Sequence, residues 1–242
     1  MRPTALASWL IVSATFCVPS TAQTSTKCNP LQGEFVGRSV VPFGSHTDTE
    51  AGTCPADPAL GKSTTIDFTK GIPSDFTASG RPTFDSNGAS FSIAQSGDAP
   101  TLTSNWYIMF GHVEIVMKAA PGVGVVSTLV LQSDDLDEID YEWLGGDDTQ
   151  VQSNYFSKGQ TTTYNRGAFH PNAGNHDGFH KYTVDWTAQQ VVWQIDGVTV
   201  RALTQASTGA QGYPQTPMQI KIGAWSGGDP SNAPGTIGKN FM

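Results

Sequence analysis

The segment DDLDEIDYEWLGG at residues 134–146 constrains the fold more than any other part of the chain. Apolar and acidic side chains alternate along it, and successive side chains of a β-strand point to opposite faces. One face would carry Ile139, Tyr141 and Trp143, and the other Glu138, Asp140 and Glu142. A strand with one apolar face is typical of an antiparallel sheet that covers a core on one side. The segment therefore predicts such a strand, with three carboxylates in a row on its outer face.

Three carboxylates in register have a chemical consequence. At ~6.6 Å spacing along a strand, full ionisation is disfavoured, so at least one pKa should rise. A displaced or shared proton is what general acid/base chemistry requires, and paired carboxylates are typical of glycoside hydrolysis or transfer. The Cα atoms of Glu138 and Glu142 would lie ~13 Å apart on a straight strand. A retaining enzyme needs its carboxyl groups ~5–5.5 Å apart, so the prediction requires a curved sheet with this row on its concave side.

The alternative is an acidic, solvated strand or a calcium site to which Asp134, Asp135 and Asp137 contribute, because hard cations bind clustered oxygens. Calcium loops bend so that several oxygens converge, whereas this segment alternates like a straight strand. Spacing alone leaves catalysis and the surface or ion site at even odds.

The remaining sequence predicts an all-β domain. Glycine (26 residues) and proline (15) are frequent and only 14% of residues are charged, which suits short strands joined by turns. Asp196-Gly197 between two apolar runs predicts a hairpin, because its turn needs positive φ. We find no long segment with a helical period, no internal repeat and no linker between two cores, so we expect one β-sandwich with room for a short helix. The expected strands are 64–68, 89–94, 106–119, 123–132, 136–144, 150–156, 161–165, 180–186, 191–195, 198–203 and 218–225.

The N-terminus has the pattern of a secretory leader. Arg2 precedes an apolar stretch from Ala5 to Val18 that is too short to span a bilayer, and small residues before position 23 predict cleavage after Ala22. We therefore expect a signal peptide at 1–22 and no transmembrane segment. Residues 23–60 are expected to form a loop-like arm. Cys28 and Cys54 lie in it and most simply form a disulfide; a pair of free thiols is the alternative.

Other functional classes receive little support. The formal net charge of −8 offers no basic track, so we expect no nucleic-acid partner. His170, His176 and His180 have spacings that suggest zinc, but two lie in a loop and no further ligand accompanies them, so we expect no metal. A strained G-x-S-x-G turn is absent, which disfavours a serine hydrolase. We interpret Trp186, Trp193 and Phe110 as core residues.

The segment Asp137–Glu142 resembles the E-x-D-x-E signature of glycoside hydrolase family 16, and most closely its fungal Crh-type (Congo red hypersensitive) cell-wall transglycosylases. Further similar segments are Lys27–Pro30, Gly97–Pro100, Met117–Pro121, Gln152–Phe156, Ile222–Trp225, Gly227–Pro230 and Gly235–Ile237. The resemblance implies a concanavalin A-like β-jelly-roll sandwich of two antiparallel sheets with a concave sugar-binding cleft. It also implies that Glu138 is the nucleophile, Asp140 the assisting carboxylate and Glu142 the general acid/base, with no cofactor.

Several polar and aromatic residues are candidates for binding sugar. Trp225 precedes a glycine-rich turn and could stack on a sugar ring, with an ordinary core or rim tryptophan as the alternative. Gln152 and Asn154 share a strand face and match polar cleft residues of the family; simple cross-strand pairing is the alternative. Tyr107 lies on a strand that could border the cleft, and Arg166 could reach it from a loop.

The resemblance implies a secreted, retaining enzyme of the fungal cell wall that cleaves chitin and transfers the glycosyl unit to β-glucan or chitin. We expect a monomer. The alternatives are a β-1,3 or mixed-linkage glucanase and a non-catalytic, lectin-like sandwich, which the complete carboxylate row disfavours. A shortened, inactive product is a further alternative.

The chain departs from the family pattern in two places. Residues 32–52 form an insert, which we interpret as an unspliced intron or a lineage-specific loop. The catalytic domain, expected at 61–242, stops soon after Ile237, where relatives continue with another tryptophan and a final strand. We interpret this end as a truncation, and the C-terminal GPI signal that many relatives carry is absent from this chain.

Overall fold

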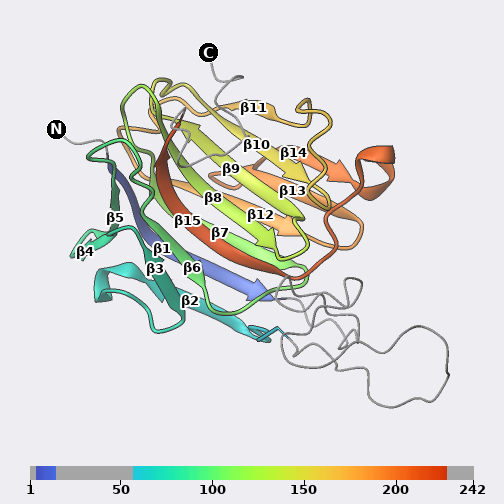
Figure 1. Cartoon of the computed structure of the whole chain (residues 1–242), viewed down its shortest axis with the longest axis horizontal. Coiled ribbons are helices and arrows are strands. Elements are labelled where there is room, and N and C mark those ends of the chain that lie inside the picture. The colour runs from blue at the N-terminus through green and yellow to red at the C-terminus, as the bar shows by residue number, and fades with distance from the viewer. Residues whose placement is uncertain (1–3, 15–56, 228–242) are drawn as a thin grey trace, which may run out of the picture.

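The computed structural model describes residues 4–14 and 57–227, which form two antiparallel β-sheets packed face to face (Figure 1). The seven-stranded sheet runs in the order β11 (Ala168–Pro171), β10 (Gln150–Phe156), β9 (Glu138–Leu144), β8 (Val125–Ser133), β15 (Met218–Ser226), β6 (Thr101–Ser104) and β3 (Phe76–Ser79). The eight-stranded sheet runs in the order β14 (Val198–Thr204), β13 (Gln190–Ile195), β12 (His180–Trp186), β7 (Gly111–Lys118), β1 (Thr4–Ala14), β5 (Gly88–Ser92) and β4 (Thr83–Asp85), and β2 (Ser63–Asp67) also pairs with β1. The helical content of the described ranges is three short 3₁₀ turns, at Phe68–Lys70, Gln205–Ser207 and Gly209–Gln211. The predicted all-β sandwich is confirmed.

The core lies between the two sheets, and the apolar row of β9 is at its centre. Ile139, Tyr141 and Trp143 are all fully buried, as strand parity predicts. The rings of Tyr141 and Trp143 stack on each other, and both meet Tyr182 of the opposite sheet edge-on, with ring centroids 5.7 Å and 4.5 Å away. Such aromatic contacts bury large apolar areas and fix the orientation of the strand. The outer face of β9 is therefore held away from the core.

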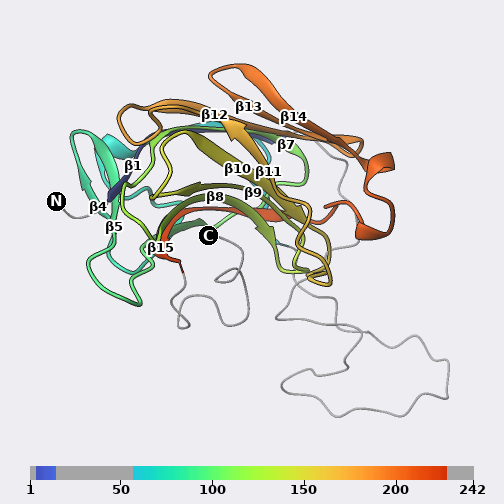
Figure 2. The same ribbon diagram turned by 90° about the horizontal axis from the view of Figure 1, so that it is seen from above.

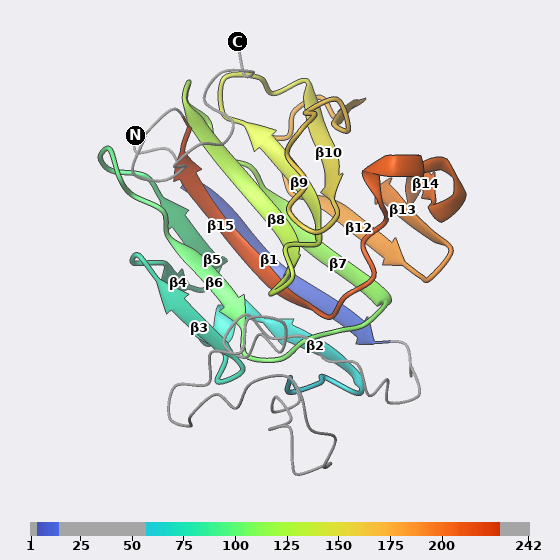
Figure 3. The same cartoon turned by 45° about the vertical axis from the view of Figure 1, so that its right-hand side comes forward.

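The seven-stranded sheet is arched, and its concave side faces away from the eight-stranded sheet (Figure 2). Strands β9, β8 and β15 lie side by side at the middle of this arch (Figure 3). The carboxylate row of β9 lies on this concave side because its apolar partners face the other sheet. The row thus lies on the concave side of a curved sheet.

Most predicted strands are found, and two were bounded correctly at both ends, β10 and β12. The Asp196-Gly197 hairpin is also confirmed, with φ values of 50° and 80°. The predicted strand at 161–165 is wrong: this segment is a loop, and the real strand β11 begins at Ala168. The run 106–119 was too long, because Phe110 adopts φ of 65° and β7 begins only at Gly111. The short strands β3, β4 and β6 were not predicted.

The predicted signal peptide overlaps a strand of the structure. Thr4–Ala14 forms β1, which pairs with β7 on one side and with β2 and β5 on the other. Ala5 and Leu10 of this strand are buried in the core. Cleavage after Ala22 would remove β1 from the mature protein. This cleavage stays a prediction.

Several sequence predictions fall outside the described residues. Cys28 and Cys54, the insert at 32–52 and the chain end after Gly227 all lie there. Among the described residues, no helix has the length and apolar character needed to cross a membrane.

Candidate active site

Strand β9 places Glu138, Asp140 and Glu142 in the middle of the seven-stranded sheet. The strand is paired on both sides, with β8 and β10, so the row sits on a rigid support. Glu138 is partly exposed, whereas Asp140 and Glu142 are only 3% and 7% exposed. The row therefore combines one carboxylate that solvent reaches with two that neighbouring side chains enclose.

Burial has the largest effect on the protonation of Asp140. It raises the pKa of this carboxyl well above its usual value, and the negative charges of Glu138 and Glu142 raise it further, as does a hydrogen bond with Glu138. The cationic Arg201 acts in the opposite direction, but its effect is smaller. The shift favours the protonated form of Asp140, which can donate a hydrogen bond to Glu138. Trp193, on β13 of the opposite sheet, donates a 3.2 Å hydrogen bond from Nε1 to the backbone oxygen of Asp140.

Glu142 is also held in its protonated form. Burial, followed by the charge of Glu138, raises its pKa from 4.5 to about 8. The rise in pKa that the carboxylate spacing predicts is therefore found at two of the three positions. A carboxylic acid that keeps its proton at neutral pH is suited to act as a general acid.

Glu138 has a polar partner that sequence reasoning missed. Gln132 lies directly opposite it on β8 and donates a 2.6 Å hydrogen bond from Nε2 to Oε2 of Glu138. This contact depends on the register between two strands, and no local pattern in the sequence indicates it. The carboxylate with the most solvent access is thereby fixed in orientation.

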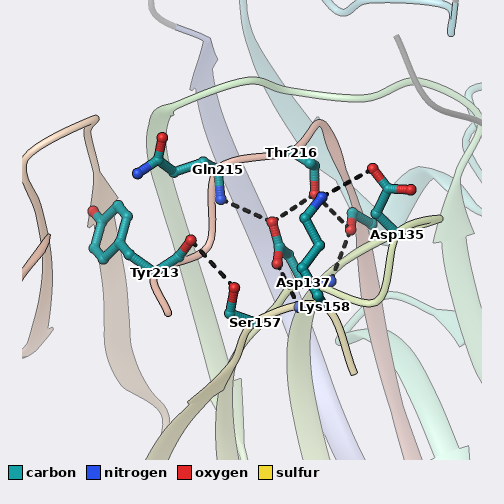
Figure 4. Close-up of polar contacts among 8 residues, drawn as sticks. Asp135, Asp137, Ser157, Lys158, Tyr213, Gln215 and Thr216 are labelled. Carbon is teal, nitrogen blue, oxygen red and sulfur yellow. Dashed lines mark hydrogen bonds and ion pairs between the residues drawn. The ribbon is translucent and has the colours of Figure 1, made fainter. Parts of the chain in front are cut away.

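Asp137, the residue before Glu138, connects three loops next to the first residue of β9 (Figure 4). It is fully buried, and its carboxylate accepts hydrogen bonds from the backbone N–H groups of Lys158 and Gln215, both 2.8 Å, and from the Thr216 hydroxyl at 2.7 Å. Its own N–H donates to the hydroxyl of Ser133. Charge-assisted bonds of this kind are the stronger ones in proteins. Asp137 therefore ties the β8–β9 turn, the turn after β10 and the loop before β15 together beside Glu138.

The polar residues predicted on β10 lie next to the row. Gln152 is directly opposite Glu142, and Asn154 is directly opposite Asp140. Both are partly exposed. Trp225 is partly exposed as well, and lies further along the same sheet on β15, opposite Val126. These three residues are brought to the sheet that carries the carboxylates.

Tyr107 and Arg166 make contacts that the sequence did not indicate. The hydroxyl of Tyr107 is 3.3 Å from both carboxylate oxygens of Asp134, and burial, followed by the charge of Asp134, raises its pKa to about 12. Arg166 is 3% exposed, donates from Nη2 to the carbonyl of Thr163, and lies 4.5 Å above the ring of Phe156. Tyr107 thus lies near the β8–β9 turn, and Arg166 stabilises the loop that precedes it in the chain.

The residues proposed as alternative metal ligands do not converge. His170 Nε2 contacts the Ser153 hydroxyl, and His180 Nδ1 contacts Asp196. The carboxylate of Asp135 pairs with Lys158. Across residues 4–14 and 57–227, no group of three or more His, Cys, Asp or Glu side chains is placed to hold a metal ion.

Comparison with protein families and relatives gives a consistent result. The family model described as Glycosyl hydrolases family 16 matches residues 73–241. "Crh-like protein 4" of Aspergillus fumigatus is 61% identical over 218 residues, which cover 90% of this chain and 44% of the relative. "Congo red hypersensitive protein 1" of Saccharomyces cerevisiae is 50% identical over 186 residues, 76% of this chain and 36% of that protein. The chain thus spans about half or less of the length of these relatives.

A solved structure is similar over most of the described fold. "Crh5 transglycosylase in complex with NAG" superposes with a TM-score of 0.71 at 52% sequence identity, covering 76% of this chain and 77% of that one. A β-glucanase of Bacillus licheniformis has the same fold at 24% identity, with a TM-score of 0.57.

Proposed function

The chain belongs to glycosyl hydrolase family 16, and from this membership we propose that it is a retaining glycosidase and transglycosylase that remodels the fungal cell wall. The observation that carries the proposal is the Glu138–Asp140–Glu142 row on the concave side of the sheet, in which Glu142 has a pKa of about 8. An ionised carboxylate beside a protonated one is the pair that retaining glycoside chemistry uses.

In the first step, an oxygen of the Glu138 carboxylate attacks the anomeric carbon of the donor sugar. The bond between that carbon and the glycosidic oxygen breaks, and Glu142 gives its proton to the departing oxygen. A covalent glycosyl-enzyme and a shortened sugar chain result. Asp140, protonated between the two glutamates, donates a hydrogen bond to Glu138 and restrains its orientation.

In the second step, Glu142 is ionised and accepts the proton of an incoming hydroxyl. The oxygen of that hydroxyl bonds to the anomeric carbon, and Glu138 leaves as a carboxylate. A sugar hydroxyl gives transfer and water gives hydrolysis, so acceptor binding decides the ratio.

The substrates are proposed from the names of the relatives and the chemistry of the site. The relatives include a transglycosylase whose structure contains NAG, which supports a chitin-type donor and a chitin or β-glucan acceptor. We assign Gln152 and Asn154 to the sugar next to the carboxylates because they lie opposite Glu142 and Asp140. Trp225 would stack on a more distant ring, while Tyr107 and Arg166 would shape the loops around the sugar-binding cleft. The proposed location is extracellular, in the cell wall.

The test is a transfer assay with fluorescent β-glucan as acceptor and chitin oligosaccharides as donors, with Glu138→Gln as the control. Labelled hybrid product that is lost in Glu138→Gln supports transglycosylation. New reducing ends without hybrid product would mean hydrolysis. Cleavage of mixed-linkage glucan in place of chitin would support the glucanase alternative. Sugar binding with no cleavage would support the lectin-like one.

A further inference from the structure

The side chain of Gln132 connects a half-buried cation, Lys221, to Glu138. Lys221 of β15 donates a 2.6 Å hydrogen bond from Nζ to Oε1 of Gln132 on β8. The amide of Gln132 then donates from Nε2 to Oε2 of Glu138, also at 2.6 Å. Lys221 is paired with Val130 in the register of β15 and β8, so its long side chain reaches diagonally to Gln132, two residues further along β8. The three groups form a continuous line across three adjacent strands.

Lys221 has lost much of its contact with water. Burial lowers the pKa of its ammonium, and the negative charges of Glu138 and Asp134 act in the opposite direction. In the ranges 4–14 and 57–227, it makes no ion pair with a carboxylate closer than 4.0 Å. A partly desolvated cation without a direct counter-ion is costly unless a structured neighbour compensates it. The hydrogen bond to Gln132 and the charge of Glu138 supply that compensation.

We infer that Lys221 and Gln132 are positioning residues that hold Glu138 in the ionised form and orientation that nucleophilic attack requires. The inference rests on the proposed function, because it assigns Glu138 the role of nucleophile. An ammonium group can only donate, so it binds the oxygen end of the Gln132 amide and directs the NH₂ end toward Glu138. The oxygen of Glu138 that faces this NH₂ is therefore an acceptor, and a carboxylate accepts such a bond more strongly than a neutral carboxyl does. The charge of Lys221 at the other end of the amide attracts the negative charge of Glu138, so the line of contacts favours the ionised form.

The line of contacts also acts on Glu138 through charge. The charged and titratable groups of the row and of this line are Asp140 and Glu142 on β9, Asp134 after β8, Lys221 on β15 and Arg201 on β14. Burial and neighbouring charge favour the protonated forms of Asp140 and Glu142, so Glu138 is the carboxylate of the row that must carry the negative charge, and a protonated carboxyl is a poor nucleophile. Lys221 favours the ionised form of Glu138 without occupying the space in front of it, because Gln132 lies between them.

The experiment measures kcat/KM for transfer against pH in Lys221→Met, Gln132→Met and Lys221→Arg. Lys181→Met is the matched control: it removes the same charge from β12, where Lys181 pairs with Glu114 at 3.2 Å. In Lys221→Met we expect the acidic limb of the profile to move up by about one pH unit, which is about a tenfold loss of rate at a pH on that limb. Gln132→Met should move the limb in the same direction, Lys221→Arg should restore part of the shift, and Lys181→Met should leave it in place. A uniform loss at all pH values would overturn the inference, since a structural defect has that effect.

A second measurement does not depend on the reaction. The urea midpoint at pH 7 is compared in wild type, Lys221→Met, Glu138→Gln and the double variant. We expect Lys221→Met to lower the midpoint more with Glu138 present than with Gln at that position, because only the ionised partner needs the cation. Equal effects in both backgrounds would overturn the inference. If the wild-type protein shows no transfer but the effects of the Lys221 and Glu138 substitutions on the midpoint depend on each other, the proposed function fails. The contact between Lys221, Gln132 and Glu138 would still be supported.

Discussion

Replacement of Glu142 by glutamine should change how stability depends on pH. Glu142 is 7% exposed, and burial with the charge of Glu138 raises its pKa from 4.5 to about 8. Between these pH values the folded protein holds a proton here that the unfolded chain releases. The folded state binds more protons, so this group makes stability fall as pH rises from about 4.5 to about 8. Glutamine has the same shape and cannot titrate.

The magnitude follows from the shift. One pKa unit corresponds to 1.36 kcal/mol, so the full shift corresponds to about 5 kcal/mol, with a slope of about 1.4 kcal/mol per pH unit inside the window. Below pH 4.5, Glu142→Gln and wild type should have similar free energies of unfolding. By pH 8 the variant should be the more stable by several kcal/mol. The gain comes from not having to bury an ionised carboxylate beside Glu138.

The assay is urea denaturation at intervals from pH 4.5 to 8.5, with the difference in unfolding free energy between variant and wild type plotted against pH. Glu114→Gln controls for the loss of one negative charge, because Glu114 lies on β7 of the other sheet and pairs with Lys181. A difference for Glu142→Gln that stays constant from pH 5 to 8 would refute the reasoning. It would mean that Glu142 is ionised across this range and is not the proton donor.

Four further predictions concern the pH dependence of the reaction, the stability of two positions and the processing of the N-terminus. The kcat/KM for transfer should fall above about pH 8, because Glu142 must be protonated to act as an acid; a rate that is flat to pH 9.5 would contradict this. Asp137→Asn should lower the unfolding free energy by about 1–3 kcal/mol in urea titration, because an amide NH₂ would face donors that now bind carboxylate oxygens; an unchanged midpoint would count against the role of Asp137. Gly145→Ala should lower the free energy of unfolding, measured in urea, by about 1–3 kcal/mol, because the new Cβ would clash with the carbonyl oxygen of Gly122. Gly178→Ala is the control, since a Cβ at that position would meet nothing within 4 Å. Mass spectrometry of protein secreted by a fungal host should find Gln23 as the first residue; a chain that retains residues 4–14 would show that β1 belongs to the mature fold.

The fold was predictable where the sequence pattern repeats within one strand. Alternation fixed the two faces of β9, and the Asp-Gly pair fixed the β13–β14 hairpin. The short strands β3, β4 and β6 have three or four residues each, too few for a period to be recognised. The loop at 161–165 contains β-favouring threonines, but its conformation is held by the side chain of Arg166, which donates to the carbonyls of Thr163 and of the preceding Gln160. Such a tertiary contact leaves no local pattern.

The candidate site likewise contains residues that the pattern within one strand predicts and residues that it does not. Parity along β9 and β10 placed the carboxylates, Gln152 and Asn154 on one sheet face, and the register then sets them opposite each other. Gln132 and Lys221 could not be assigned from the sequence, because they meet Glu138 only through the pairing of β15, β8 and β9. Asp137 looked like one more member of an acidic run, and its burial depends on loops 20 to 80 residues further along the chain. Contacts between strands that are distant in sequence thus decide which acidic and polar residues take part.

The N-terminal apolar stretch shows why local pattern alone cannot assign every segment. A continuous apolar run meets the requirements of a secretory leader and also those of a strand that is covered on both faces. Residues 4–14 have backbone partners on both edges, and the buried Ala5 and Leu10 contribute to the core. Backbone pairing does not depend on side-chain identity, so a place between β5 and β7 accepts any extended apolar segment that can reach it. The carboxylate row, by contrast, is set by the pairing of β9 with β8 and β10, neither of which touches β1 in the sheet order. Removal of residues 1–22 should therefore affect the stability of the eight-stranded sheet far more than the arrangement of Glu138, Asp140 and Glu142.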